Sequence, residues 1–182
     1  MIFNGSMENR DHSIGKIIND FIVEQLEEQN VKTTIFDMSL SNIPMLNPSL
    51  IKEIPIEVTQ MCNTFQDADL HFWLMPLYHG SIPGVMKNCL DWLEITAKSA
   101  TPYLTDKIIG TVCWADGSHA VNGIQTMNNI AHSLRAWTIP YSVPLSVREL
   151  FQNESKDRLS SNSQEKLKLL VRLALSRKIQ TI

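Results

Sequence analysis

Two kinds of apolar pattern alternate along the chain. Short, nearly continuous apolar runs predict buried strands at residues 1–4, 31–36, 68–75, 108–114 and 139–143. Longer segments in which apolar side chains recur every three or four positions predict helices at residues 13–29, 55–65, 83–96, 122–137 and 164–178. A polar stretch over residues 152–163 predicts a linker before the last helix.

The alternation of strands and helices favours an α/β fold, a parallel sheet with helices on both faces. Right-handed crossovers leave few topologies, and we expect the strand order 2-1-3-4-5 in a single domain of residues 1–182. In such sheets ligands bind outside the carboxyl ends of the strands, near the point where the strand order reverses. A site is therefore expected in the loops that follow the first, third and fourth strands.

Composition narrows the possible functions. The 182 residues, 43% hydrophobic and 19% charged, suffice for one globular core. A net charge of −3 gives no reason to expect nucleic acid. No run of about 18 apolar residues predicts a membrane span, and the first residues lack the basic and apolar regions of a signal peptide. We expect a cytoplasmic protein that binds neither nucleic acid nor membrane.

Three types of residue are interpreted as structural. Cys62, Cys89 and Cys113 are widely spaced within apolar patterns, which favours reduced core thiols over a nucleophile or metal ligands. The five histidines lack the helical spacing of a zinc site, so no metal is expected. Asp37 follows the second strand too far after Gly5 for a ribose-binding acid and is interpreted as a turn residue.

The loop after the third strand has the composition of a ligand-binding turn. It contains Tyr78, His79, Gly80 and Ser81 directly after Pro76. Glycine lets the backbone approach a ligand closely, and serine offers a hydrogen bond. Tyr78 and His79 are the best candidates to touch a bound reactant. A loop-capping aromatic and a solvated histidine are the alternative interpretations.

The loop after the first strand favours a phosphate. Ser6, Arg10 and Ser13 surround the predicted start of a helix, where free amides and the helix dipole attract anions. Arg10 would add a forked, charged hydrogen bond. The alternative is that Ser13 or Asp11 only caps the helix. Neither a dinucleotide G-x-G-x-x-G motif nor a Walker motif follows this strand.

Over most of its length the chain resembles the NADPH-dependent FMN reductase family of flavodoxin-like flavoenzymes. The family's first motif, G-S followed by an arginine and then a serine at the helix start, is matched by Gly5, Ser6, Arg10 and Ser13. Its second motif, P-x-Y-x-G-S-x-P-G-x-x-K-N-x-x-D-W, is matched at Pro76, Tyr78, Gly80, Ser81, Pro83, Gly84, Lys87, Asn88, Asp91 and Trp92.

The resemblance implies a flavodoxin-like fold with FMN as cofactor and NADPH or NADH as co-substrate. It makes the first-motif residues phosphate ligands and lines the isoalloxazine with Pro76, Leu77, Tyr78, His79, Gly80 and Ser81. Asp116, Gly117 and Ser118, in the loop after the fourth strand, would cover the other edge of the ring.

The activity that the resemblance implies is an FMN-dependent oxidoreductase. NAD(P)H reduces bound FMN, and a small-molecule acceptor such as a quinone, a flavin or an azo compound then takes the electrons. Tyr78 and His79 would be the catalytic contacts. The alternative is a flavin-binding redox sensor, an electron carrier or a non-catalytic accessory protein of the same fold.

Four departures from the family pattern bear on this site. Leu77 and His79 alter the usual Pro-Glu-Tyr-Asn sequence, and Gly15 stands where an asparagine is common. The loop after the fourth strand lacks a glycine run, and the first strand is short. We therefore expect changed polar contacts around the ring and a weaker phosphate site.

The helix after the second motif suggests an assembly. Lys87, Asn88 and Asp91 lie on one side of it, next to Trp92. An indole beside a polar cluster is typical of an interface centre, and family members dimerise through this helix. We expect a homodimer or a homotetramer; a solvated face with an intrahelical ion pair is the alternative.

Overall fold

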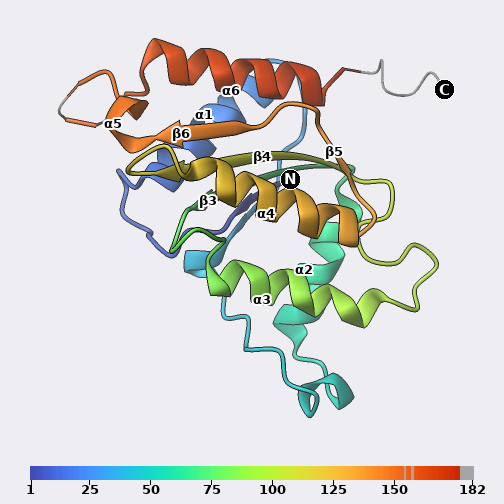
Figure 1. The fold of residues 1–182 in the computed structure, drawn as a ribbon. Helices are drawn as coiled ribbons and strands as arrows, with labels where there is room; N and C mark the ends of the chain where they lie inside the picture. Colours follow the sequence, from blue (N-terminus) through green and yellow to red (C-terminus); the bar gives the residue numbers. More distant parts are fainter. Residues whose placement is uncertain (154, 157, 177–182) are drawn as a thin grey trace.

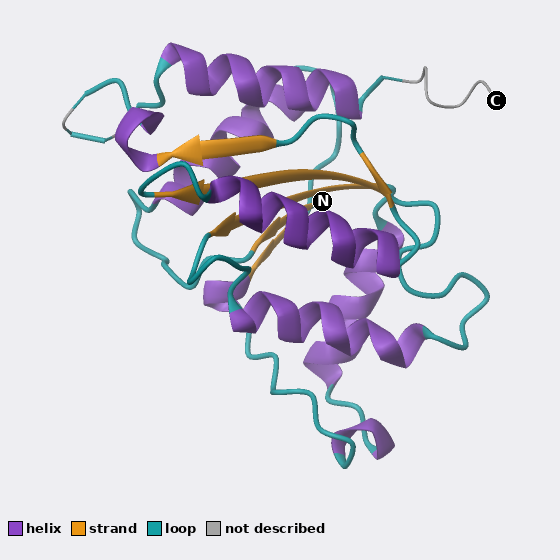
Figure 2. Cartoon of the chain, viewed as in Figure 1, coloured by secondary structure: helices purple, strands orange, loops and turns teal. Residues whose placement is uncertain are grey.

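The computed structural model describes residues 1–153, 155–156 and 158–176. Its sheet contains β1 (Ile2–Asn4), β2 (Ile35–Asp37), β3 (Leu70–Pro76), β4 (Ile108–Ala115), β5 (Trp137–Thr138) and β6 (Val143–Ser146). The strands are parallel in the order β2-β1-β3-β4-β5, and β6 also pairs with β4. The predicted order is confirmed. The strands are drawn in orange in Figure 2.

Helices cover both faces of the sheet (Figure 1). They are α1 (Ile14–Glu27), α2 (Ile56–Asp67), α3 (Gly84–Trp92), α4 (Ala120–Ser133), α5 (Val147–Leu150) and α6 (Ser161–Ala174). One core lies between the sheet and α2, α3 and α4, where β3 contributes Trp73 and Met75. The other lies under α1 and α6, where β3 contributes Phe72 and Leu74. This alternation explains why the strand sequence is apolar at every position.

The second strand is shorter than predicted. Residues 31–34 are not in a strand, and β2 begins at Ile35, which is opposite Ile2 of β1. Because β1 supplies only three residues to the ladder, only three residues of β2 find partners. The segments that precede β1, β2 and β3 border a cavity of about 500 Å³, whose lining includes Met1, Thr34 and Leu70.

The fourth long helix ends earlier than predicted. Residues 134–137 were expected within it, but α4 stops at Ser133 and Trp137 lies in β5. Arg135 adopts a left-handed conformation, with φ of 66°. The amide of Ala136 donates to Ala131 O and that of Arg135 to His132 O, which is the Schellman pattern of helix termination. An arginine replaces the usual glycine there, so the sequence carries no stop signal.

The fifth predicted strand and the last helix also differ from the prediction. The expected strand 139–143 is interrupted: β5 ends at Thr138 and β6 begins at Val143, with Pro140, which cannot donate to a ladder, in the gap. The last helix begins at Ser161, not at residue 164, because the hydroxyl of Ser160 accepts the amide of Ser163 and caps it. Its predicted end at Lys178 lies outside the described residues.

The cysteines are core thiols, as interpreted from the sequence. All three cysteines are free and buried, and burial raises the pKa of each thiol to about 12. Within the described residues, no group of three or more His, Cys, Asp or Glu side chains could hold a metal ion. In the same part of the chain, no helix is both long and apolar enough to cross a bilayer.

Candidate functional site

Three loops meet at the carboxyl edge of the sheet. Loop 1 (residues 5–13), loop 2 (77–83) and loop 3 (116–119) follow the neighbouring strands β1, β3 and β4. The amide of Gly5 donates to Leu74 O at 2.7 Å, and the amide of Leu77 donates to Trp114 O at 2.9 Å. Every site residue predicted from the sequence therefore lies at this one edge.

Loop 1 is fixed at its base by a buried amide. Asn4, the last residue of β1, accepts the amide of Ser6 at 3.1 Å and donates to Asp37 at 3.0 Å. The hydroxyl of Ser6 accepts the amide of Glu8 at 3.2 Å. Among the described residues, the backbone amides of residues 9–12 donate no hydrogen bond. The loop therefore has a rigid base and free donors at its tip.

Ser13 caps α1, as the alternative interpretation held. Its side chain accepts the amide of Lys16 at 3.4 Å. A hydroxyl that accepts in this way keeps its own proton free to donate, so the cap does not exclude contact with a phosphate. The first turn of α1 contains no acidic residue, which leaves the positive end of the helix dipole available.

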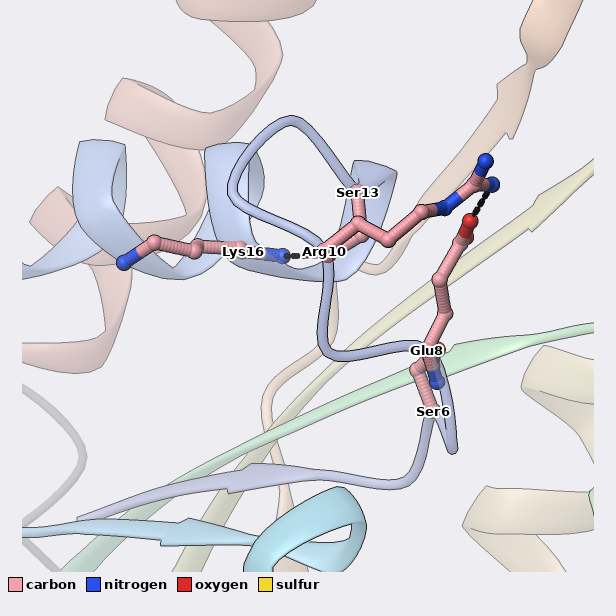
Figure 3. Close-up of polar contacts among 5 residues, drawn as sticks. All are labelled: Ser6, Glu8, Arg10, Ser13 and Lys16. Carbon is pink, nitrogen blue, oxygen red and sulfur yellow. Dashed lines mark hydrogen bonds and ion pairs between the residues drawn. The ribbon is translucent and has the colours of Figure 1, made fainter.

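Arg10 already has a partner. Its guanidinium donates to the Glu8 carboxylate, and the two side chains reach toward each other on one side of loop 1 (Figure 3). Lys16 extends away from them and pairs with Asp20 at 3.3 Å. Arg10 is the only lysine or arginine in residues 5–13.

Gly15 is explained by packing against Asn4. A Cβ atom at Gly15 would lie 2.9 Å from Asn4 Oδ1 and 3.3 Å from Ser6 Cβ. The space that a side chain at this position would need is thus occupied by the asparagine at the end of β1. The amide group near loop 1 comes from the strand and not from the helix.

Loop 2 is a tight turn that presents two side chains to solvent. Tyr78 and Ser81 exchange both backbone hydrogen bonds at 3.0 Å, while His79 and Gly80 have φ of 49° and 82°. Two consecutive positive φ values define a type I′ turn. The Tyr78 side chain is 59% exposed, and His79 is exposed beside it.

Pro76 is buried, and Leu77 is half-buried with its side chain packed against the core. Pro76 ends β3, and Leu77 Cδ1 would lie 3.1 Å from a Cβ atom at Gly123 of α4. The Leu77 side chain therefore packs on α4. A ligand above loop 2 would meet the backbone of these residues.

The glycines of loops 2 and 3, and Gly84 at the start of α3, border open space. A Cβ atom at Gly80, Gly84 or Gly117 would have no heavy atom within 4 Å. Asp116 and Ser118 beside Gly117 are exposed. Since packing does not require these glycines, their unobstructed faces leave room for a flat ligand.

The cluster on α3 has a different role from the one expected. Trp92 is fully buried and donates through Nε1 to Pro44 O at 2.7 Å. Asn88 accepts the amide of Leu46 at 2.8 Å and donates to Pro44 O at 2.9 Å. Lys87 and Asp91 form an intrahelical ion pair. Trp92 therefore holds the segment 41–49 of its own chain and is not exposed as an interface centre.

Two residues of the site were missed from the sequence. Asn4 is a polar residue that ends a buried apolar strand, a signal that it serves the loop that follows. Glu8 lies two positions before Arg10, the only lysine or arginine of the loop, and this spacing could have predicted their ion pair. Asp37 was interpreted correctly: it accepts the amide of Ser39 at 2.8 Å and so caps the turn after β2.

The donor set of loop 1 and the open, glycine-lined edge fit FMN. Free amides, two hydroxyls, a helix N-terminus and Arg10 suit its phosphate, and the space above loops 2 and 3 suits its ring. Fold and site together define a flavodoxin-like flavoprotein. The chain belongs to the NADPH-dependent FMN reductase family, whose model matches residues 1–148.

Relatives agree with this assignment. The NADPH-dependent FMN reductase ArsH of Rhizobium meliloti is 23% identical over 90% of this chain, which spans 64% of the length of that protein. The FMN-dependent NADPH-azoreductase of Staphylococcus aureus is 22% identical over 92% of this chain and 87% of its own.

A solved structure shows the same fold. FerB, a flavoenzyme NAD(P)H:acceptor oxidoreductase from Paracoccus denitrificans, superposes with a TM-score of 0.71 at 15% identity, covering 95% of this chain and 94% of its own.

Proposed function

We propose that the protein is an FMN-dependent NAD(P)H oxidoreductase that reduces a small-molecule acceptor such as a quinone, a free flavin or an azo compound. Family membership supports the cofactor and the reductant. The observation that carries the proposal is the meeting of an anion-binding loop with two open, glycine-lined loops at one edge of the sheet. When bound, FMN would supply the hydride chemistry.

The chain's residues bind and orient in this scheme. Gly5, Ser6, Arg10 and Ser13 hold the phosphate, together with the free amides of loop 1. The backbone of residues 76–81 follows one side of the ring, and Asp116, Gly117 and Ser118 border the other. The exposed side chains of Tyr78 and His79 contact the nicotinamide or the acceptor.

We also propose that the protein forms a homodimer or a homotetramer. Because Trp92 is buried, the apolar surface for such an association lies elsewhere. Several side chains along residues 40–56 are large, apolar and exposed: Leu40, Met45, Ile51, Ile54 and Ile56. Light scattering that gives only the 20.7 kDa monomer mass would reject this assembly.

The direct test of the activity is spectroscopic. The purified protein is titrated with FMN, then with NADPH or NADH under anaerobic conditions, and finally with a quinone, an azo dye or free flavin. Bleaching of bound flavin by the nicotinamide and its recovery with an acceptor are expected. Bound flavin that neither donor reduces would favour a sensor or an accessory protein.

Two variants assign roles within loop 2. His79→Ala and Tyr78→Phe should lower turnover about tenfold, as expected for lost contacts to a reactant, while the dissociation constant of FMN changes little. His132→Ala, a change at the opposite end of α4, is the control and should leave turnover unchanged. Equal turnover in all four proteins would remove Tyr78 and His79 from the site.

A further inference from the structure

In loop 1 the Glu8 carboxylate pairs with Arg10, the only lysine or arginine of the loop (Figure 3). The Arg10 side chain is 82% exposed and the Glu8 side chain 38%, so the pair lies at the protein surface, open to an incoming phosphate.

A phosphate that binds here meets competition from within the loop. Arg10 must leave Glu8, or share its donors, before it forms a forked pair with an incoming anion. Glu8 and Asp11 also place two negative charges in a loop with one positive charge, and like charges oppose a phosphate near its dianionic state. Lys16 cannot compensate, because it points away and pairs with Asp20.

We propose that Glu8 is an internal competitor of the flavin phosphate and so sets how strongly the site prefers FMN to riboflavin. Riboflavin lacks the phosphate and leaves the Glu8–Arg10 pair intact. FMN gains Arg10 only when Glu8 releases it. The preference for FMN is therefore smaller than loop 1 could provide, and bound FMN exchanges more readily. This inference rests on the FMN site proposed above.

The experiment is a mutant cycle on loop 1. Dissociation constants for FMN and for riboflavin are measured by quenching of flavin fluorescence, at constant salt, for the wild type, Glu8→Gln, Arg10→Gln and the double variant. Asp11→Asn is the matched control, because it removes a negative charge from the same loop without touching the pair. Since all these side chains are at the surface, circular dichroism should show every variant folded.

Glu8→Gln should tighten FMN binding about fivefold, the upper range for release of an exposed ion pair, and change riboflavin binding less than about twofold. Asp11→Asn should have a clearly smaller effect on FMN. In the Arg10→Gln background the effect of Glu8→Gln should fall to the Asp11→Asn level, which identifies competition for Arg10.

Other results would overturn the proposal in distinguishable ways. Equal tightening by Asp11→Asn, or the same gain without Arg10, would show only a general charge effect. Tightening of riboflavin as much as FMN would separate Glu8 from the phosphate. If FMN binds the wild type and Glu8→Gln equally tightly, Glu8 does not compete for Arg10, but the proposed FMN site is unaffected. If neither protein binds FMN, the proposed site itself is wrong.

Discussion

Single side chains at the base of the site do more than the motifs alone suggest. Asn4 joins β1, loop 1 and the turn after β2 through one amide group, and Gly15 exists to leave room for it. A side chain at position 15 and the Asn4 amide would compete for the same space. We expect this competition to appear as an energetic coupling between the two positions.

Gly15→Asn tests that coupling. A side chain there must displace the Asn4 amide, so we expect a loss of about 2 kcal/mol in the free energy of unfolding, typical of overpacking. In an Asn4→Ala background the same change should cost at least about 1 kcal/mol less, because the space is vacant. Urea unfolding of the four proteins measures the cycle. Additive losses would contradict the coupling between the two positions.

Asn88 was predicted to lie at an interface, but in the structure it anchors the segment 41–49. Asn88→Ala leaves the amide of Leu46 and the carbonyl of Pro44 with fewer partners, so the free energy of unfolding should fall by about 2 kcal/mol. Segment 41–49 should also become more sensitive to limited proteolysis. Lys87→Ala, one position earlier and exposed, is the control and should cost about 0.5 kcal/mol. A similar loss in both variants would argue against the anchoring role.

At the scale of elements, the sequence predicts most of the architecture. Strand order, helix positions and the three site loops follow from apolar periodicity and from the rules for parallel sheets. The misplaced boundaries have particular causes. Arg135 ends α4 in a conformation that glycine usually marks, and β2 is limited by a partner strand that is distant in sequence. The burial of Trp92 depends on its contact with Pro44, 48 positions away, which spacing alone does not show. The Glu8–Arg10 pair is local, and its two residues are only two positions apart.

The close packing of α4 against the sheet at Gly123 can be tested by substitution. A Cβ atom at Gly123 would lie 2.6 Å from Cys113 Sγ, whereas at Gly84 of α3 it would meet nothing within 4 Å. Gly123→Ala should therefore lower the free energy of unfolding by about 1 kcal/mol despite the better helix propensity of alanine. Gly84→Ala should raise it by about 0.5 kcal/mol. Thermal unfolding of the flavin-free proteins measures both changes. The change in the free energy of unfolding is expected to have opposite signs in the two variants, and the same sign in both would contradict the packing argument.

For the whole molecule, one buried group links stability to pH. Burial lowers the pKa of His71 to about 3, and its Nε2 lies 3.1 Å from Ala68 O. The unfolded chain takes up a proton on this histidine below its ordinary pKa of about 6.5, while the folded protein stays neutral there. Stability is therefore unaffected above that pH and is lost as pH falls toward 3, by about 1.4 kcal/mol per unit from this group.

His71→Gln should remove the part of the loss of stability at low pH that His71 causes. Although the variant is less stable at pH 7, its free energy of unfolding should decline less steeply between pH 6 and about 4 than that of the wild type. His132→Gln, an exposed position, is the control and should keep the wild-type slope. Parallel curves for all three proteins would show that His71 is not the group responsible.

The brevity of β1 has a consequence for the order in which the sheet comes apart. Strand β2 is tied to the sheet by three register pairs with β1, while β3 and β4 share seven. Amide protons of β2 should exchange with solvent deuterium through local fraying, at rates that do not follow global stability. Those of β3 and β4 should exchange only when the whole molecule unfolds. Asp37 ends β2 and accepts a hydrogen bond from Asn4 at the base of loop 1, so fraying of β2 would reach the proposed phosphate site through this bond.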